Sequence, residues 1–210
     1  MTLPSITISS VTTCRFALRN AFVIARGSKT EAITVVVHVT DGQHTGRGEA
    51  VPYARFGESV EATVATLNQL AAQPLRDPAH AVASLPAGAA RNALDCALWD
   101  LRAKTTGEGI ASRLQMGILQ PVQTFFTLSL DTPVNMAAQA QQWPGLSAFK
   151  LKLGCGDAET DLACLRSVRT ARPSARLIVD ANEAWHANQL EELLRGAAEL
   201  GVELIEQPLP

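Results

Sequence analysis

Long apolar runs are absent from this chain of 210 residues. No window approaches the roughly 18 consecutive apolar residues that a membrane-spanning helix requires. Hydrophobic residues nevertheless make up 47% of the chain, which is ample material for a core. The sequence therefore predicts a soluble globular protein and excludes a membrane span.

A surplus of one charge is also missing. Eighteen Lys and Arg face twenty Asp and Glu, which gives a formal net charge of -2. Proteins that bind nucleic acid or anionic lipid through general electrostatics need a positive surface. We therefore expect neither nucleic acid nor a membrane as a partner.

Cysteines are few and irregularly spaced, at Cys14, Cys96, Cys155 and Cys164. A chain of this length does not depend on disulfides, and no pair has the short spacing of a zinc site. The first residues also lack the basic region, apolar stretch and cleavage site of a secretory signal. These absences predict reduced thiols, a mature N-terminus and a cytoplasmic protein.

The first part of the chain has the alternating rhythm of an antiparallel sheet. A turn at residues 40–43 reverses the chain between two of the runs. Helices are expected over residues 59–73 and from residue 88 onward, where apolar residues recur at helical spacing. The four β-rich runs are residues 5–11, 16–22, 33–39 and 46–51.

From about residue 121 short apolar strands alternate with helices. This alternation predicts right-handed crossovers and a parallel sheet, with strands about 25 to 28 residues apart, as in a (β/α)8 barrel or a doubly wound sheet. No glycine-rich dinucleotide fingerprint follows any strand, which favours the barrel. The expected strands are residues 124–130, 149–153, 177–180 and 202–206, with helices near 134–142, 158–171 and 190–197.

Four parallel strands do not close a barrel, which needs about eight. We therefore expect either a fragment of a longer protein or a half-barrel whose open edge another chain covers. An exposed parallel edge invites association. The isolated chain is accordingly predicted to be poorly soluble or a homo-oligomer.

Two lysines, Lys150 and Lys152, stand in a strand that is otherwise apolar. Because side chains alternate along a strand, both lysines share one face. Inside a barrel, two neighbouring ammonium groups would lower each other's pKa and suit one of them to act as a base. The alternative is an edge strand with a solvated lysine face.

Two further strands end in carboxylates, Asp180 and Glu206. In a parallel barrel the carboxyl ends of the strands form the rim of the active site, so these acids should converge near the lysines. A hard divalent cation such as Mg²⁺ would relieve their repulsion. The alternative is a helix-capping or loop role for each acid.

The pattern of a lysine pair, a strand-end Asp and a strand-end Glu on three successive strands resembles that of the enolase superfamily, in its muconate-lactonizing branch. Three other stretches resemble the dipeptide epimerases of that branch, which act on L-Ala-D/L-Glu. These stretches are residues 22–28, 53–59 and 85–100.

The resemblance implies an α/β protein with an N-terminal α+β capping domain, residues 1–118, followed by the first half of a modified (β/α)7β barrel, residues 119–210. It implies a Mg²⁺-dependent epimerase that removes an α-proton from a small dipeptide and passes through an enolate. The implied roles are Lys152 as base, Lys150 as its charge-tuning neighbour, Asp180 and Glu206 as metal ligands, and Arg26 and Thr127 as substrate contacts.

The third metal carboxylate, the opposing lysine and the acids that receive the dipeptide ammonium belong to later strands in the family. They are not in this sequence, so we expect a truncated chain with impaired activity and weak Mg²⁺ binding. Two alternatives stay open: another enzyme of the branch, a cycloisomerase or o-succinylbenzoate synthase, and a truncated remnant without catalysis.

Overall fold

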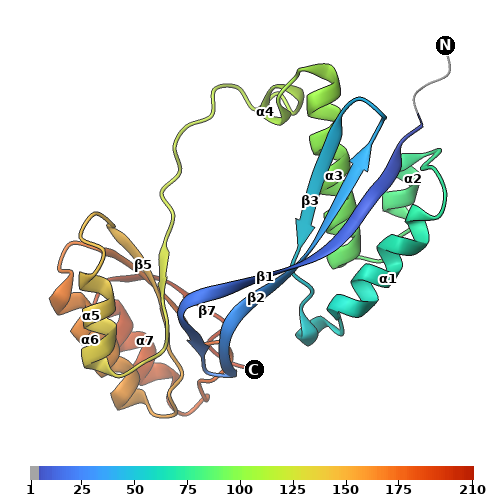
Figure 1. Ribbon diagram of the computed structural model, residues 1–210. Coiled ribbons are helices and arrows are strands. Elements are labelled where there is room, and N and C mark those ends of the chain that lie inside the picture. Colours follow the sequence, from blue (N-terminus) through green and yellow to red (C-terminus); the bar gives the residue numbers. More distant parts are fainter. Residues whose placement is uncertain (1–4) are drawn as a thin grey trace. The chain divides into compact units, whose positions relative to one another are not determined.

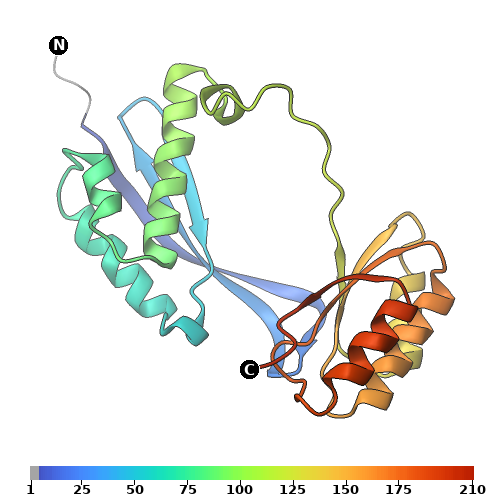
Figure 2. The same ribbon diagram turned by 180° about the vertical axis from the view of Figure 1, so that it is seen from behind.

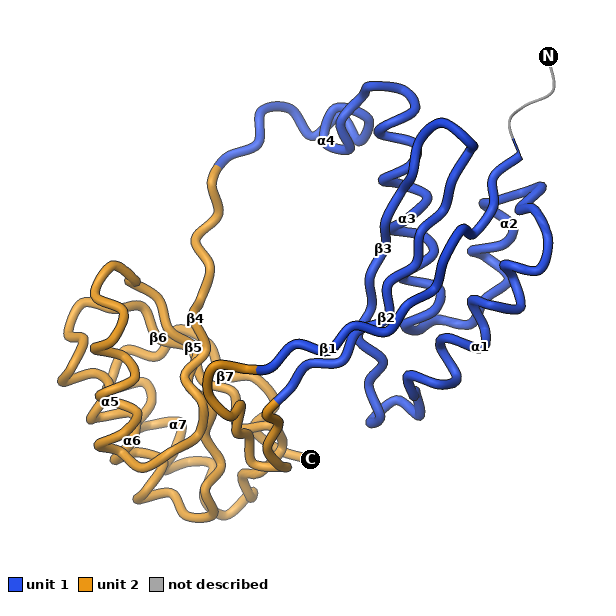
Figure 3. The backbone as a smooth tube through the Cα atoms, in the orientation of Figure 1, with its two compact units in different colours: residues 1–17, 31–120 blue, residues 18–30, 121–210 orange. Residues whose placement is uncertain are grey.

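The structure is a computed structural model that describes residues 5–210 and falls into two compact units (Figures 1 and 3). Unit 1 holds the described residues 5–17 and Glu31–Gln120. Unit 2 holds Leu18–Thr30 and Pro121–Pro210. Each unit has its own buried apolar cluster, and each is described by itself.

The first two strands, β1 (Thr7–Ile24) and β2 (Gly27–Thr40), belong in part to each unit. The prediction of two separate runs, 5–11 and 16–22, is wrong, because β1 continues through the residues between them. β-branched threonines in that stretch suit an extended backbone, and β1 neighbours β2 in the sheet. The predicted domain division at residues 118 and 119 stays a prediction.

Unit 1 is built on a three-stranded sheet in the order β1-β2-β3, where β3 spans Thr45–Ala50. β2 and β3 pair antiparallel, from Val35 opposite Ala50 to Thr40 opposite Thr45. The predicted antiparallel sheet is thus confirmed. Its apolar cluster includes Val35, Val37, Val39, Leu67, Leu94 and Leu101.

The helices of unit 1 begin with polar caps where the sequence supplies them. Ser59 accepts a hydrogen bond from the Ala62 N–H, and Asp77 accepts one from the His80 N–H. The elements are η1 (Ala54–Phe56), α1 (Val60–Ala71), α2 (Pro78–Ala83), α3 (Ala89–Thr106) and α4 (Ile110–Arg113). The two predicted helices, α1 and α3, are confirmed, and three short helical elements of the described residues, η1, α2 and α4, were not predicted.

Two glycines of β3 let α3 approach the sheet closely. A Cβ on Gly48 would lie 1.9 Å from the carbonyl oxygen of Ala93. A Cβ on Gly46 would lie 2.1 Å from the carbonyl oxygen of Ala97. Because these are backbone atoms that cannot rotate away, the contact requires glycine.

Unit 2 contains the predicted alternation of strands and helices. Its four strands are parallel and lie in the order β4-β5-β6-β7. The predicted α/β fold, a capping domain with an antiparallel sheet followed by parallel strands of a partial barrel, is confirmed. The elements are β4 (Phe126–Leu128), α5 (Pro133–Gln141), β5 (Ala148–Lys152), α6 (Ala158–Ala171), β6 (Arg176–Asp180), α7 (Leu190–Glu199) and β7 (Val202–Glu206).

The helices of unit 2 cover one face of its sheet (Figures 1 and 2). Phe149, Leu151 and Leu153 are fully buried in one cluster with residues of α5, α6 and α7. Strand alternation therefore turns Lys150 and Lys152 to the opposite face, as predicted. None of the helices formed by residues 5–210 has the length and apolarity to cross a bilayer.

Candidate active site

The ends of three neighbouring strands bring the predicted lysines and acids into one row. Lys152 lies opposite Asp180 in the register of β5 and β6, and Asp180 lies opposite Glu206 in that of β6 and β7. Carboxyl ends of parallel strands meet at one edge of a sheet, which is why residues so far apart in sequence are adjacent here.

Asp180 and Glu206 each bind lysine in this row. Lys152 Nζ donates a hydrogen bond to Asp180 Oδ2 at 2.5 Å, and Lys150 Nζ lies 3.0 Å from the same oxygen. Lys150 Nζ also donates to Glu206 Oε2 at 2.5 Å. Lys152 is 8% exposed and Asp180 1% exposed, so the row has a buried end and an open end at Glu206.

The charges in this row stabilise one another. Burial would raise the pKa of Asp180, but hydrogen bonds from Lys152, Lys150 and the Asn182 N–H outweigh it and lower that pKa. Burial would lower the pKa of Lys150, but hydrogen bonds to Glu206 and Asp180 outweigh it and raise that pKa. The sequence predicts that each lysine lowers the pKa of the other. This prediction is wrong for Lys150, because the hydrogen bonds to the two acids outweigh the repulsion between the two ammonium groups.

Thr127, predicted as a substrate contact, lies on β4 directly opposite Lys150 in the parallel register. Paired residues of neighbouring strands point to the same face. Thr127 therefore shares the face of the sheet that carries both lysines, and it is partly buried there.

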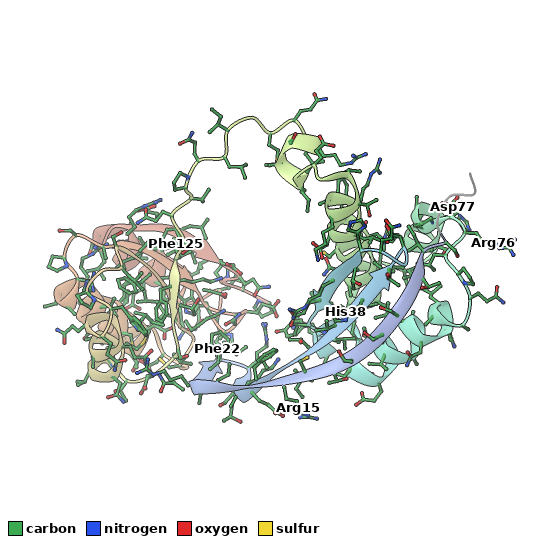
Figure 4. All side chains as sticks on the ribbon, turned by 45° about the horizontal axis from the view of Figure 1, so that its top comes forward. Arg15, Phe22, His38, Arg76, Asp77 and Phe125 are labelled. Carbon is green, nitrogen blue, oxygen red and sulfur yellow. The ribbon has the colours of Figure 1, made fainter. Side chains whose placement is uncertain are left out.

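The tip of the β1–β2 hairpin belongs to unit 2 and lies against the strand ends. The Phe22 ring centroid is 5.8 Å from Lys152 Nζ, a cation–π distance (Figure 4 labels Phe22). The Val23 carbonyl accepts a hydrogen bond from the Leu130 N–H at 3.1 Å. The hairpin tip therefore places an aromatic ring beside Lys152.

Arg26, at the same tip, contacts the turn that follows β6. Its Nη1 donates to the Asn182 carbonyl oxygen at 2.6 Å and lies 3.1 Å from Glu183 Oε2. Neither Asn182 nor Glu183 is among the predicted site residues. Both follow Asp180 closely, and the tolerance of Asn for left-handed backbone was the available signal.

A buried acid that is not among the predicted site residues, Asp161 on α6, joins two loops next to the row. It accepts hydrogen bonds from the backbone N–H groups of Gly154 and Cys155, from the Cys155 thiol at 2.8 Å, and from Trp185 Nε1 at 2.7 Å. Asp161 thus ties the loop after β5 to the loop after β6. Its position inside a helical pattern gave no sign of this role.

The oxygen donors at the strand ends suit a hard cation. Asp180 and Glu206 supply two carboxylates, and the buried Asn182 Oδ1 accepts no hydrogen bond from the residues that the structure describes. Within residues 5–210, no group of three His, Cys, Asp or Glu is arranged for a metal. Because Mg²⁺ retains several waters and takes few carboxylates, the pair fits as part of a Mg²⁺ site.

Two family models match the chain. Residues 7–114 match the mandelate racemase / muconate lactonizing enzyme N-terminal domain. Residues 135–210 match the enolase C-terminal domain-like family. Together they cover both units.

Curated relatives include epimerases and racemases. The L-Ala-D/L-Glu epimerase of Escherichia coli strain K12 is 41% identical over 199 residues, which are 92% of this chain and 60% of that protein. An N-acetyl-D-glutamate racemase of a Pseudoalteromonas species is 38% identical over 84% of this chain and 56% of that protein. The chain therefore spans about 60% of the length of these relatives.

Solved structures agree in fold. An enolase family member from Agrobacterium tumefaciens, with homology to dipeptide epimerases and with bound sodium and L-Ala-L-Glu, superposes with a TM-score of 0.88 at 42% identity. That match covers 98% of this chain and 62% of the other. A dipeptide epimerase of Enterococcus faecalis, complexed with Mg and L-Leu-L-Tyr, has a TM-score of 0.87 at 27% identity, over 98% of this chain and 62% of the other.

The row of lysines and acids at the strand ends, the two family models and the shared fold agree with one another. This chain belongs to the mandelate racemase / muconate lactonizing enzyme family of the enolase superfamily.

Proposed function

We propose that this protein is a Mg²⁺-dependent epimerase of L-Ala-D/L-Glu-type dipeptides. The single observation that carries the proposal is the row of Lys152, Asp180, Lys150 and Glu206, whose hydrogen bonds link three strands at one edge of the sheet. A relative named for this dipeptide and a solved structure that holds L-Ala-L-Glu, each matching more than nine-tenths of this chain, support the choice of substrate.

In this proposal Lys152 takes the α-proton of the glutamate moiety. The side chain is almost fully buried beside the Phe22 ring, which holds its amino group at the strand ends and away from bulk water. Asp180 holds the amine in place through its 2.5 Å hydrogen bond. Transfer of the proton to Lys152 leaves an enolate on the substrate, and return of a proton to the opposite face of the same carbon completes the epimerisation.

Lys150 steadies the negative charge that develops on the enolate. Its ammonium already bridges Asp180 and Glu206, and burial is only partial, so the positive charge is retained at neutral pH. Fixed positive charge in a partly dry site stabilises a developing anion without reorganisation. Thr127, opposite Lys150 on the same face, contacts the substrate.

Asp180 and Glu206 would hold the Mg²⁺. When bound, the ion would supply additional positive charge for the carboxylate of the substrate and for the enolate oxygens. Relatives crystallised with Mg and a dipeptide support this choice of cation. The free thiols of all four cysteines support a reducing, cytoplasmic location.

Arg26 would receive the side-chain carboxylate of the glutamate moiety. A planar guanidinium suits a carboxylate because it offers two parallel N–H donors. Two relatives are named for glutamate compounds, one for a dipeptide and one for an N-acetyl derivative. Both of these compounds carry the side-chain carboxylate. An N-acylated glutamate is therefore the second candidate substrate.

The test is exchange of the α-proton of L-Ala-L-Glu in D2O with Mg²⁺, followed by NMR. We expect the Lys152→Ala variant to lose at least about a hundredfold in exchange rate. Lys104→Ala is the matched control, because Lys104 pairs with Asp100 on the exposed side of α3. Exchange that survives in the Lys152 variant, or its absence from the unaltered chain, would contradict the proposal.

A further inference from the structure

The turn after β6 has an unusual backbone. Asn182 and Glu183 are consecutive residues with left-handed φ angles of 49° and 66°. Such residues cost of order 1 kcal/mol each when they are not glycine, so the surroundings must hold them. The Asn182 N–H donates to Asp180 Oδ1 at 2.9 Å, and the Glu183 N–H donates to the Gln207 carbonyl at 2.7 Å.

This backbone brings two acceptors of the turn to one nitrogen of Arg26. The Asn182 carbonyl oxygen accepts from Nη1 at 2.6 Å, and Glu183 Oε2 lies 3.1 Å from the same nitrogen. Both side chains of the ion pair are mostly buried, with exposures of 30% for Arg26 and 19% for Glu183. The guanidinium is therefore fixed through Nη1.

The opposite edge of the guanidinium is not used by the described part of the chain. Within residues 5–210, Nε and Nη2 of Arg26 donate no hydrogen bond. These two N–H groups form a parallel pair that fits a carboxylate in the bidentate geometry. Holding Nη1 restricts rotation of the side chain, so less freedom is lost when a carboxylate binds.

We propose that Glu183 is a positioning residue that sets the preference for acidic over neutral substrates. It fixes Arg26 through Nη1 and so presents the Nε–Nη2 edge to the side-chain carboxylate of the substrate. The inference rests on the proposed function, and it adds a specificity role for a residue that contacts Arg26 and not the substrate.

The experiment compares L-Ala-L-Glu with its isosteric neutral analogue L-Ala-L-Gln in the same exchange assay. We expect Glu183→Ala to raise KM for L-Ala-L-Glu about tenfold and to leave kcat, and both constants for L-Ala-L-Gln, unchanged. Glu183→Gln retains a side-chain acceptor for Nη1 and should restore most of the loss. In an Arg26→Ala background, Glu183→Ala should have no further effect.

Three results would overturn the inference. A lower KM for L-Ala-L-Glu in Glu183→Ala would mean that Glu183 competes with the substrate for Arg26. Equal losses for both dipeptides would mean a general structural role, as would losses that add to those of Arg26→Ala. Melting curves of both Glu183 variants identify a failure to fold, and Glu183→Gln then decides.

Failure of the proposed function gives a different pattern. If the unaltered chain exchanges neither dipeptide, the epimerase proposal fails, and titration calorimetry with L-Ala-L-Glu and L-Ala-L-Gln tests the inference without chemistry. A tenfold weaker affinity of Glu183→Ala for the acidic dipeptide alone supports it. Equal affinities of both proteins, or no binding by the unaltered chain, contradict it.

Discussion

The two units bury different kinds of side chain. In the part of the chain that the structure describes, the buried polar residues of unit 1 are the threonines Thr34 and Thr63. Those of unit 2 are Lys152, Asp161, Asp180 and Asn182, three of them ionisable. Burying charge is costly unless every charge is paired, and unit 2 pairs each of the three ionisable side chains with named donors or acceptors.

The two units differ in whether they bury charged side chains, and only unit 2 carries the candidate site. Unit 1 closes its core with valines, leucines and the close contact between α3 and β3. Unit 2 has an apolar core of its own on the helix side of the sheet. It carries Lys152 and Asp180 at the strand ends, and Asp161 on α6 binds the loops beyond them. Site chemistry is therefore built on the side of the sheet that its helices do not cover.

The substitution expected to change the stability of unit 2 most is at Asp180. Asp180→Asn leaves Lys152 and Lys150 facing an uncharged amide in a largely buried place, and the free energy of unfolding should fall by about 3 to 5 kcal/mol. Urea denaturation measures the change. Glu203→Gln, which removes an exposed carboxylate paired with Arg176, is the control and should change little. If Asp180→Asn were as stable as the unaltered protein, or more stable, the ion pairs of Asp180 would not stabilise the fold and the prediction would be wrong.

A second difference separates two exposed cysteines, Cys155 of unit 2 and Cys96 of unit 1. Cys155 is exposed as a residue, but partial burial of its thiol and the hydrogen bond from Sγ to Asp161 raise the pKa of Cys155 to about 12. Since the thiolate is the reactive form, Cys155 should react with iodoacetamide at pH 8 about a hundredfold more slowly than Cys96. Peptide mass spectrometry after timed labelling compares the two, and equal rates would refute the Asp161 bond.

Unit 1 should respond to added volume at Gly48. Gly48→Ala places a Cβ against the Ala93 carbonyl, so α3 must move, and we expect a loss of about 2 kcal/mol in stability. Gly109→Ala is the matched control, because a Cβ there meets nothing within 4 Å and its φ of -64° suits any residue. Thermal melting that ranks the two variants equally would contradict the close contact.

The smallest effect is on the pH dependence of stability. Because the pKa of Asp180 is lowered in the folded state, its contribution is present above the unfolded pKa of about 3.9 and is lost as pH falls through the lower folded value. Urea unfolding of the unaltered protein should therefore lose more stability than Asp180→Asn between pH 5 and pH 3. If both proteins lost the same stability over this range, the pKa of Asp180 would be the same in the folded and unfolded states, and the prediction would be wrong.

Much of the fold could be predicted from periodicity. Alternation of side chains along β2 and β5, and helical spacing in α3, each depend on a few neighbouring residues. β1 was predicted as two pieces because its middle is polar, and only pairing with β2 shows one strand. Strand-end acids were found because Asp180 and Glu206 each follow an apolar run.

Other parts of the site had no local signal. Asp161 lies in a helix among ordinary polar residues, and its four donors come from Gly154, Cys155 and Trp185. The raised pKa of Lys150 reverses what two adjacent lysines predict, because the acids that decide it lie 30 and 56 residues away in sequence. Long-range partners determine electrostatics, and sequence spacing does not reveal them.

The sequence by itself determined which residues carry charge, which strand faces they occupy and which acids end a strand, since these follow from a period of two along the backbone. Only the tertiary structure decided that Asp180 binds both lysines and that Arg26 is held by Glu183. The physical reason is that hydrogen bonds and ion pairs act over a few ångströms, and the folded sheet and its hairpin set those distances.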